Sequence, residues 1–472
     1  MGDLIKNCSE NGLGAINLYK DSVVLISGGT GFIGKVLIEK LLRSFNVKKI
    51  YLLLREKQNV KFKTRLKEIF REPIFNVIRE SHPDPASVFS KVIAVDTNFQ
   101  NEKIISADDM KLLEAEVTIV FNVMASVKFN ESIDSALDTN VVCSRKLFDI
   151  VSKMAQVRSV VHVSTFYSNC NRSRIEERIF EDIPFGGYSN LLEILSHLQE
   201  NEKKCLTPSI LGTMPNSYTF SKKCAEAMIQ QSYAHLPICI FRPPVVTSAY
   251  REPIPGWVDN FNGISGMCVP MIQGKFYCCM AEREIASHTV PVDYCVAAML
   301  AVGAERARTR GEATGTVPVF NYATDVNNIR WGDFGKWISK GCESLLGRLF
   351  GRYALVLTSS RFLRQMFVWW FILQAVAADL LLAFLGKKRQ HLRTVKRLFA
   401  LEDAARYFAM HGWTVQNDNM RRVMNRMNDE ERNLLKLDID RLDWDDYFKD
   451  FLPGVKAALA RSYQRRLSRL GG

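Results

Sequence analysis

Tyr218 and Lys222 lie four residues apart in the segment NSYTFSKKCAE. Four residues make about one helical turn, so both side chains would project from one face of a helix. A tyrosine hydroxyl titrates near ~10, and a neighbouring ammonium favours its ionised form. Such a tyrosine can exchange a proton with a carbonyl oxygen while a nicotinamide exchanges a hydride. The pair therefore predicts redox chemistry at a carbonyl, and the alternative is an exposed helical pair without a function.

A glycine-rich loop stands upstream of this pair, between the apolar run SVVLIS and the segment KVLIEKLLRSF, which has helical apolar spacing. A first glycine there permits a tight turn, a second lets the backbone approach a pyrophosphate, and a third allows close packing of the helix. The N-terminus of the helix would offer free N–H groups to phosphate oxygens. The alternative is a tight turn that binds nothing. The predicted cofactor-binding residues of the loop are Gly28, Thr30, Gly31, Phe32, Ile33 and Gly34.

The second predicted strand ends in Leu54-Arg55-Glu56-Lys57. An acidic residue at this strand tip binds the ribose hydroxyls of NAD, whereas an arginine accommodates the 2′-phosphate of NADP. Arg55 comes first and Lys57 is close by, which favours NADPH, but a shift of one residue would present Glu56 instead. Asp96 ends the third strand and is expected either to accept from the adenine amino group or to cap the next loop.

Ser164 and Thr165 follow directly from the fifth predicted strand, at the edge where ligands bind open α/β sheets. A hydroxyl there could donate to the substrate carbonyl oxygen beside Tyr218 and form a two-donor oxyanion site. Both remain candidates, and Thr165 is favoured. The alternative is a strand-end hydroxyl that bonds its own backbone. His162 is expected to be a core residue.

Two further roles are expected near the tyrosine. Lys222 would lower the pKa of Tyr218 and would also hold the nicotinamide ribose. Asn140, on a predicted helix beside the sheet, would help to order this network.

The order of the elements predicts an α/β fold of the Rossmann type, a doubly wound parallel sheet with crossover helices. Short apolar runs predict the strands, and stretches with helical apolar spacing separate them. The predicted strands are 22–27, 49–54, 92–95, 117–123, 159–164 and 237–242, and the predicted helices include 63–71, 107–115, 132–154 and 217–233.

The domain prediction has three parts. An N-terminal arm covers 1–20, an NADP-binding domain covers 21–330 with a substrate cap at about 250–330, and a mainly helical C-terminal domain covers 331–472. Residues 366–385 form an apolar stretch long enough to cross a bilayer, although Asp379 would be costly there. Basic residues flank it on both sides and give no orientation. The alternatives are a membrane-embedded or membrane-surface helix, a buried core helix and a partner interface.

The composition is that of a globular protein, with 47% hydrophobic and 24% charged residues among 472. A net charge of +13 suits anionic partners, such as a nucleotide cofactor, coenzyme A, an anionic membrane face or nucleic acid, or serves only solubility. The eleven cysteines show no C-x-x-C pair and no zinc spacing, so no metal site is predicted and reduced thiols facing the cytosol are expected. The N-terminus has no secretory signal, and the end LSRLGG is neither a peroxisomal nor an ER-retention address.

The chain resembles the extended short-chain dehydrogenase/reductases, and within them the eukaryotic fatty acyl-CoA reductases. The resemblance covers nearly the whole chain. The glycine loop and the tyrosine–lysine pair point only to the superfamily, whereas EPIPGWVDN and the long C-terminal unit point to the reductases. The segment after strand four departs from the family pattern, since an HxAA-type sequence is common there and this chain has Asn122-Val123-Met124-Ala125-Ser126.

The resemblance implies reduction of a long-chain fatty acyl-CoA to a primary alcohol with NADPH. It also implies a catalytic group of Tyr218 and Lys222 with Thr165 or Ser164, and a catalytic domain that faces the cytosol from a membrane. We expect the endoplasmic reticulum, with the peroxisome or lipid droplet as alternatives, and no nucleic-acid partner. Other candidate functions are an extended dehydrogenase or epimerase acting on a sterol or nucleotide-sugar, and a non-catalytic NADP-binding membrane protein.

Overall fold

The chain folds into two compact units whose segments alternate along the sequence. The computed structural model describes residues 12–56, 60–273, 278–312, 315–341 and 355–470. The first unit comprises Met1–Ile254, Val290–Thr324 and Thr414–Arg441, and the second comprises Pro255–Thr289, Asp325–Trp413 and Leu442–Gly472. The structure thus divides the chain differently from the three contiguous parts expected from the sequence.

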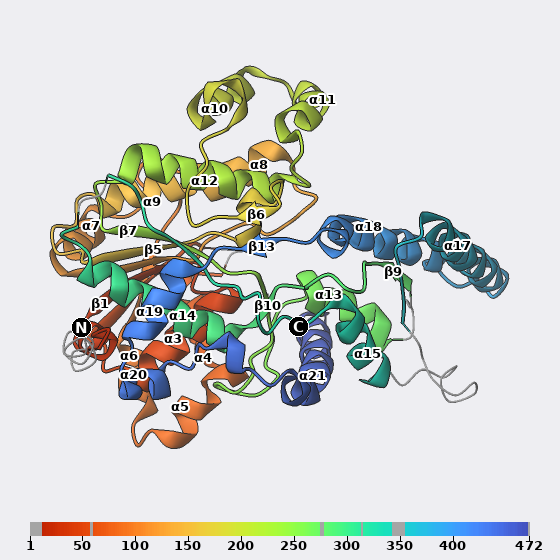
Figure 1. Cartoon of the computed structure of the whole chain (residues 1–472). Coiled ribbons are helices and arrows are strands. Elements are labelled where there is room, and N and C mark those ends of the chain that lie inside the picture. Colours follow the sequence, from red (N-terminus) through yellow and green to blue (C-terminus); the bar gives the residue numbers. More distant parts are fainter. Residues whose placement is uncertain (1–11, 57–59, 274–277, 313–314, 342–354, 471–472) are drawn as a thin grey trace. The chain divides into compact units, whose positions relative to one another are not determined.

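The core of the first unit is a seven-stranded parallel sheet (Figure 1). Apolar side chains fill both faces of the central strands, which are buried along their whole length. Because all paired strands are parallel, their carboxyl ends share one edge of the sheet. In spatial order the strands are β3 (Val92–Asp96), β2 (Lys49–Leu54), β1 (Val23–Ser27), β4 (Ile119–Asn122), β5 (Ser159–Val163), β7 (Ile238–Arg242) and β11 (Val319–Asn321).

Helices cover both faces of this sheet, as Figure 1 shows. On one face α12 packs against α8, a π-helical turn and α9. On the other face α14 packs against α3 and strands β5 and β7. The bounds are α3 Phe32–Ser44, α8 Ile133–Leu137, the π turn Asp138–Val142, α9 Cys143–Val151, α12 Ser217–Tyr233 and α14 Val292–Arg308. The predicted doubly wound α/β fold is therefore confirmed.

The first unit has further helices among the described residues. They include α4 Phe62–Phe70, α7 Ala107–Glu116, α10 Tyr188–His197, α11 Glu200–Leu211, α19 Asp418–Arg426 and α20 Asp429–Leu434.

Two predictions differ from the structure in this unit. The helix predicted over 132–154 is two helices joined by the π turn, which repositions Asn140. The part of the predicted cap from 290 to 324 supplies α14 and the seventh strand, β11. The reason for the second difference is that α14 is apolar on nearly all sides and lies buried against the sheet.

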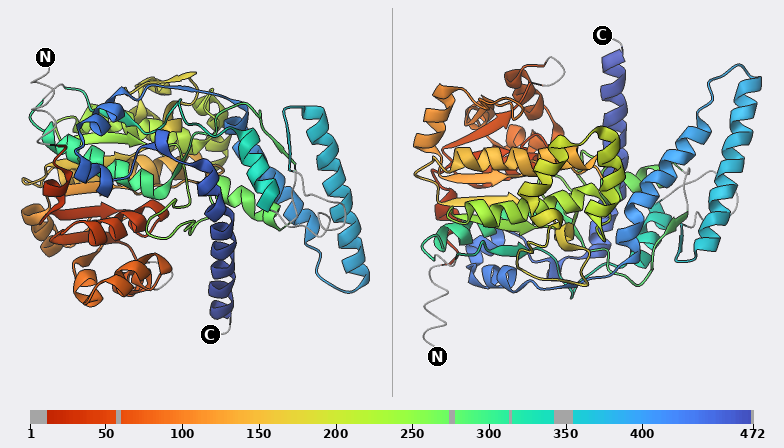
Figure 2. Two further views of the ribbon diagram at one scale, coloured as in Figure 1. Left: turned by 60° about the horizontal axis from the view of Figure 1, so that its bottom comes forward. Right: turned by 90° about the horizontal axis from the view of Figure 1, so that it is seen from above.

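The second unit is mainly helical. Its helices are α13 (Gly263–Ile272), α15 (Trp331–Gly341), α17 (Arg361–Phe384), α18 (His391–Met410) and α21 (Trp444–Leu470). The short strands β9 (Cys278–Met280) and β12 (Val356–Thr358) pair in parallel. Figure 2 shows α17 and α18 side by side as an antiparallel hairpin.

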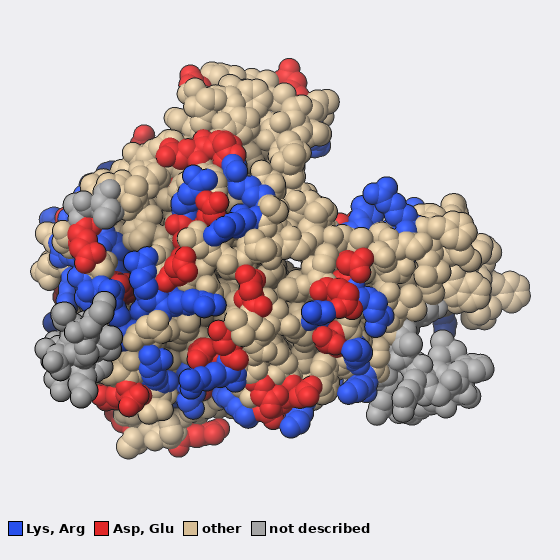
Figure 3. Space-filling view, in the orientation of Figure 1, with Lys and Arg blue, Asp and Glu red and all other residues tan. Residues whose placement is uncertain are grey.

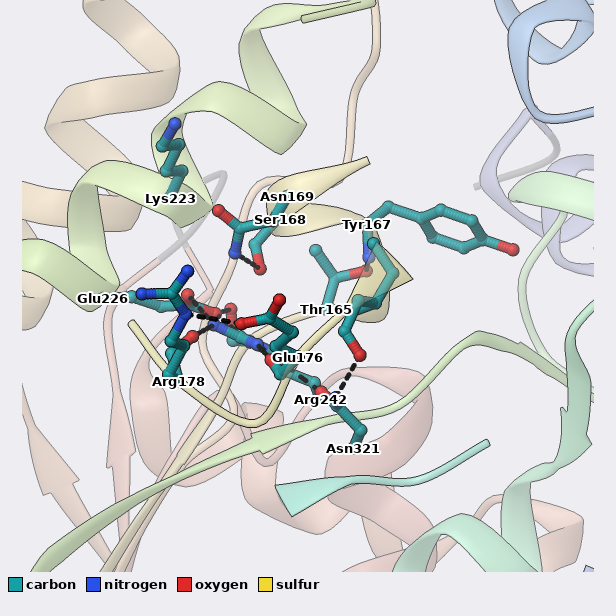
Figure 4. A network of polar contacts seen from close by, with 12 residues as sticks. Thr165, Tyr167, Ser168, Asn169, Glu176, Arg178, Lys223, Glu226, Arg242 and Asn321 are labelled. Carbon is teal, nitrogen blue, oxygen red and sulfur yellow. Dashed lines mark hydrogen bonds and ion pairs between the residues drawn. The ribbon is translucent and has the colours of Figure 1, made fainter. Parts of the chain in front are cut away.

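A buried ion pair fastens α12 to the sheet of the first unit (Figure 4). Glu226 on α12 and Arg242 at the end of β7 are both fully enclosed, and their closest atoms are 2.6 Å apart. The remaining guanidinium N–H groups donate to the carbonyl oxygens of Glu176 and Arg178, each at 2.9 Å. All of this polarity is thus satisfied inside the protein, which a buried ion pair requires.

We predict that Arg242→Met destabilises the protein strongly, because it leaves the Glu226 carboxylate buried without its counter-ion. The loss in free energy of unfolding should be about 3–5 kcal/mol, measured by urea denaturation. Arg330→Met is the matched control, because Arg330 and its partner Glu284 are 56% and 74% exposed, and such pairs contribute at most about 1 kcal/mol. Equal effects of the two substitutions would contradict a structural role for the buried pair.

Candidate active site

The glycine loop connects β1 to α3 in a conformation that only glycine allows. Gly28 has a φ of 76°, and a Cβ atom there would lie 2.6 Å from the backbone nitrogen of Met124. A Cβ atom on Gly34 would lie 2.5 Å from the carbonyl oxygen of Gly28. Gly31 precedes the first turn of α3, whose N-terminal N–H groups therefore face the loop. This cradle fits the pyrophosphate of a dinucleotide, and Thr30, Phe32 and Ile33 lie half-buried around it.

The tips of strands β2 and β3 bring Arg55 and Asp96 to the same edge. Leu54 is in register with Asp96, and Arg55 follows Leu54 directly. Both Arg55 and Asp96 are exposed, as is Glu56. The predicted contribution of Lys57 lies outside the described residues.

Arg65 on α4 is a second cation at this strand tip, and the sequence analysis missed it. Its guanidinium donates to the carbonyl oxygen of Arg55. Burial and the nearby positive charge of Arg55 lower the pKa of Arg65. Arg65 therefore adds a second positive charge beside Arg55 at the tip of β2, which suits a phosphate group. No spacing in the sequence singles out Arg65, since it comes ten residues later on a different element.

The two candidate hydroxyls after β5 point to different partners. The Thr165 hydroxyl lies close enough to Tyr218 to oppose the rise in its pKa, and it accepts from the Tyr167 backbone at 3.3 Å. The Ser164 hydroxyl donates instead to Glu226, within the buried ion-pair network. Alternation along an extended segment explains the difference, because successive side chains point to opposite sides. The structure thus brings Thr165, and not Ser164, to Tyr218.

Tyr218 and Lys222 lie one turn apart on α12, as their spacing predicts. The N-cap residue Asn216 begins this helix by accepting from the Thr219 backbone at 2.9 Å. The ring of Tyr218 packs against Phe129, with ring centroids 5.9 Å apart. The Lys222 ammonium donates to the carbonyl oxygen of Val163 at the end of β5, at 2.7 Å.

The prediction that Lys222 lowers the pKa of Tyr218 is wrong for this structure. Burial raises the pKa of Tyr218 to about 12, opposed by the hydrogen bond with Thr165. Burial also lowers the pKa of Lys222 to about 8, opposed by the negative charge of Glu226. Tyr218 is thus a neutral hydroxyl at neutral pH, able to donate a proton, while Lys222 keeps its charge below a pH of about 8.

Asn140 ties the segment after β4 to the catalytic helix. Its amide nitrogen donates to the Ser126 carbonyl at 3.2 Å and to the Ser221 hydroxyl at 2.8 Å, and its oxygen accepts from the Ser126 backbone at 2.9 Å. The π turn gives Asn140 this position, and π turns are frequent at functional sites. The segment Asn122–Ser126, which departs from the family pattern, thus runs beside Gly28, and two of these hydrogen bonds hold it to Asn140.

His162 is a core residue, as predicted. It is fully buried, and one ring nitrogen lies 3.0 Å from the Asn122 amide. Burial and the charge of Lys222 lower its pKa well below the usual value, so it is neutral. In the part of the chain that the structure describes, no group of three or more His, Cys, Asp or Glu side chains is arranged to hold a metal ion.

Comparisons with known structures agree with this fold. The terminal R domain of the myxalamid biosynthetic pathway superposes with a TM-score of 0.58 over 98% of both chains, at 15% sequence identity. The reductase domain of a nonribosomal peptide synthetase from Mycobacterium tuberculosis gives a TM-score of 0.59 over 96% of this chain and 99% of its own, at 14% identity. At these identities the similarity shows the fold alone.

Comparisons of sequence identify the family. Residues 26–299 match an NAD-binding family model described as male sterility protein, and residues 370–462 match a second model with the same description. Fatty acyl-CoA reductase wat of Drosophila melanogaster is 32% identical over 93% of this chain and 84% of its own length. Fatty acyl-CoA reductase 1 of Xenopus laevis is 33% identical and that of Homo sapiens 31% identical, with the same coverage. The chain therefore belongs to the fatty acyl-CoA reductases, alcohol-forming oxidoreductases that bind a nicotinamide cofactor and reduce a fatty acyl group.

Proposed function

We propose that this protein uses NADPH to reduce a long-chain fatty acyl-CoA to a primary alcohol, through a hemithioacetal and an aldehyde. The observation that carries the proposal is that the Thr165 hydroxyl lies beside Tyr218, one helical turn from the buried Lys222 ammonium. Two hydroxyl donors at one point can stabilise negative charge on a carbonyl oxygen. The family membership supports the fatty acyl substrate.

Residues at the carboxyl edge of the sheet would hold the cofactor. The loop from Gly28 to Gly34 would bind the pyrophosphate, Asp96 the adenine, and Lys222 the nicotinamide ribose. Arg55 would bind the 2′-phosphate together with Arg65. When bound, the cofactor supplies a hydride to the carbonyl carbon.

Side chains of the protein would stabilise the charge on the substrate carbonyl oxygen and supply its proton. Tyr218 and Thr165 donate to the thioester oxygen, which becomes negatively charged as the carbon turns tetrahedral. Collapse of the hemithioacetal breaks the carbon–sulfur bond and releases coenzyme A as a thiol, leaving an aldehyde. In a second reduction Tyr218 gives its proton to the alkoxide, and solvent then restores the proton to Tyr218.

We also propose that the protein works at a membrane with its catalytic unit in the cytosol, at the endoplasmic reticulum. Helix α17 is long and apolar enough to cross a bilayer by length and composition, and only 11% of its apolar window is buried. The nine described cysteines are all free thiols, and eight of them are buried. Reduced thiols suit a compartment that faces the cytosol.

The function is tested by supplying purified protein with NADPH and a series of saturated acyl-CoA thioesters. We expect fatty alcohol and free coenzyme A as products, with two NADPH oxidised for each alcohol, because two hydrides convert a thioester to an alcohol. Gas chromatography and absorbance of the cofactor give both numbers. The absence of oxidation with every long-chain thioester would refute the proposal, and conversion of a sugar nucleotide without net oxidation would favour an epimerase.

The two hydroxyls after β5 provide a matched test of the catalytic group. Thr165→Val should lower kcat by about 100-fold, because one oxyanion donor is lost. Tyr218→Phe should lower it further while NADPH still binds, as measured by cofactor fluorescence. Ser164→Ala should have a smaller effect on kcat, because that hydroxyl contacts Glu226 and not Tyr218. A larger loss for Ser164→Ala than for Thr165→Val would reverse the assignment.

Cofactor choice is tested at the tip of β2. Arg55→Ala should raise KM for NADPH about 10- to 100-fold, the worth of a hydrogen bond to a charged group, and leave KM for NADH nearly unchanged. Arg71→Ala is the control, since Arg71 is exposed at the end of the same helix that carries Arg65. Equal changes for both cofactors would mean that Arg55 does not contact a 2′-phosphate.

A further inference from the structure

Helix α17 carries a continuous apolar stripe along one exposed side. Successive members are three or four residues apart, which keeps them on one helical face. Their exposed fractions include 77% at Phe362, 63% at Leu373, 65% at Leu380 and 88% at Phe384. The stripe consists of Phe362, Met366, Trp369, Leu373, Val376, Leu380 and Phe384. Soluble proteins rarely leave so long a row of large apolar side chains in water.

The opposite side of α17 is attached to α18, and polar contacts hold the hairpin at both ends. Phe371 packs on Phe399 with ring centroids 5.9 Å apart. Near the start of α17, the Arg364 guanidinium donates to the buried Glu402 carboxylate on α18 at 2.9 Å. Near its end, Asp379 accepts from the backbone N–H groups of residues 390–392 at 2.9–3.0 Å. Asp379, the acidic residue within the apolar segment, thus caps the N-terminus of α18.

These attachments exclude a spanning position for α17 while the hairpin is intact. A spanning α17 would carry the charged side chains of α18 into the hydrocarbon with it, and charges there are costly. With α17 parallel to the surface, the stripe can enter the apolar layer while α18 stays in the headgroup region.

The turn and the first part of α18 are strongly basic. Six cationic side chains and no acidic ones occur between residues 385 and 397, and all six are exposed. None of the six takes part in an ion pair with another described residue. Figure 3 shows Lys and Arg gathered over α18 and a surface with few charges at α17. The six are Lys387, Lys388, Arg389, Arg393, Lys396 and Arg397.

We propose that α17 and α18 form a surface-lying membrane hairpin, in which the stripe enters one leaflet and the basic cluster binds anionic lipid headgroups. The charge of the cluster identifies an anionic bilayer as the partner, since apolar burial and attraction to acidic lipids add together. This inference rests on the proposed membrane association and defines its mode. It places α17, about 36 Å long at 1.5 Å per residue, in the plane of the surface.

Vesicle flotation of the full-length protein tests the partner. Binding should be strong to phosphatidylcholine vesicles with about 30% phosphatidylserine, and weaker to phosphatidylcholine alone. Leu373→Glu/Leu380→Glu should reduce binding at least ~10-fold, because two charges enter the stripe. The single variants Leu373→Glu and Gln374→Glu form a matched pair, because Gln374 is exposed and lies outside the stripe; Gln374→Glu should change binding less than ~3-fold. Replacing Lys387, Lys388 and Arg389 by glutamine should remove the preference for phosphatidylserine.

The depth of Trp369 tests the orientation. Lipids brominated near the headgroup end of their chains should quench its fluorescence more than lipids brominated near the terminal methyl. The Trp369→Phe variant shows how much of the total fluorescence comes from Trp369. Stronger quenching by the deep bromines would mean that α17 spans the bilayer and would overturn the proposal.

Two other outcomes would also overturn it. Absence of flotation with every vesicle would do so, as would loss of self-association in the stripe variant with unchanged flotation, which would make the stripe an interface between copies. Acyl-CoA reduction in detergent, measured on the same preparations, separates these failures from a failure of the proposed function. The stripe variant should keep that activity, since its substitutions lie outside the catalytic unit.

Discussion

The buried carboxylate of Glu226 holds together the parts from which the active site is built. It pairs with Arg242 at the end of β7, accepts from Ser164 after β5, and acts electrostatically on Lys222 one turn earlier on α12. An ionised group in so apolar a place is tolerated only when its partners are complete. The same interactions therefore fix the position of α12 against the strand ends. They also keep a positive charge on a lysine whose burial opposes it.

Burial gives the tyrosine a different character from the one its lysine neighbour suggests. A phenolate stabilised by an ammonium would act as a base, which suits oxidation of an alcohol. Burial favours the neutral hydroxyl at Tyr218, which can donate a proton. A donor is what a developing alkoxide needs, so the electrostatics agree with reduction, the direction of the fatty acyl-CoA reductases.

The second unit also contains a carboxylate whose hydrogen-bond partners lie within the protein. At α17 a carboxylate also lies within an apolar segment, but it caps the start of α18 and so needs no counter-ion. This cap and the ion pair between Arg364 and Glu402 hold α17 against α18, and the hairpin is left with one apolar side. An apolar stretch with a single acidic residue is therefore as consistent with a helical hairpin as with a membrane-spanning helix.

The sequence by itself determined the sheet, the glycine loop and the tyrosine–lysine pair on one helical face. Parallel strands are buried on both faces and read as continuous apolar runs, and the loop and the pair depend on local spacing, which chain geometry fixes. It did not show β11, a three-residue strand in a region rich in loops, nor the placement of residues 290–324 and 414–441 in the first unit. Only the tertiary structure decided that Thr165 faces Tyr218, that Arg65 lies beside Arg55, and that burial raises the pKa of Tyr218. These three features depend on which side chains meet across elements far apart in the chain and on how far water reaches them. Local residue spacing determines neither.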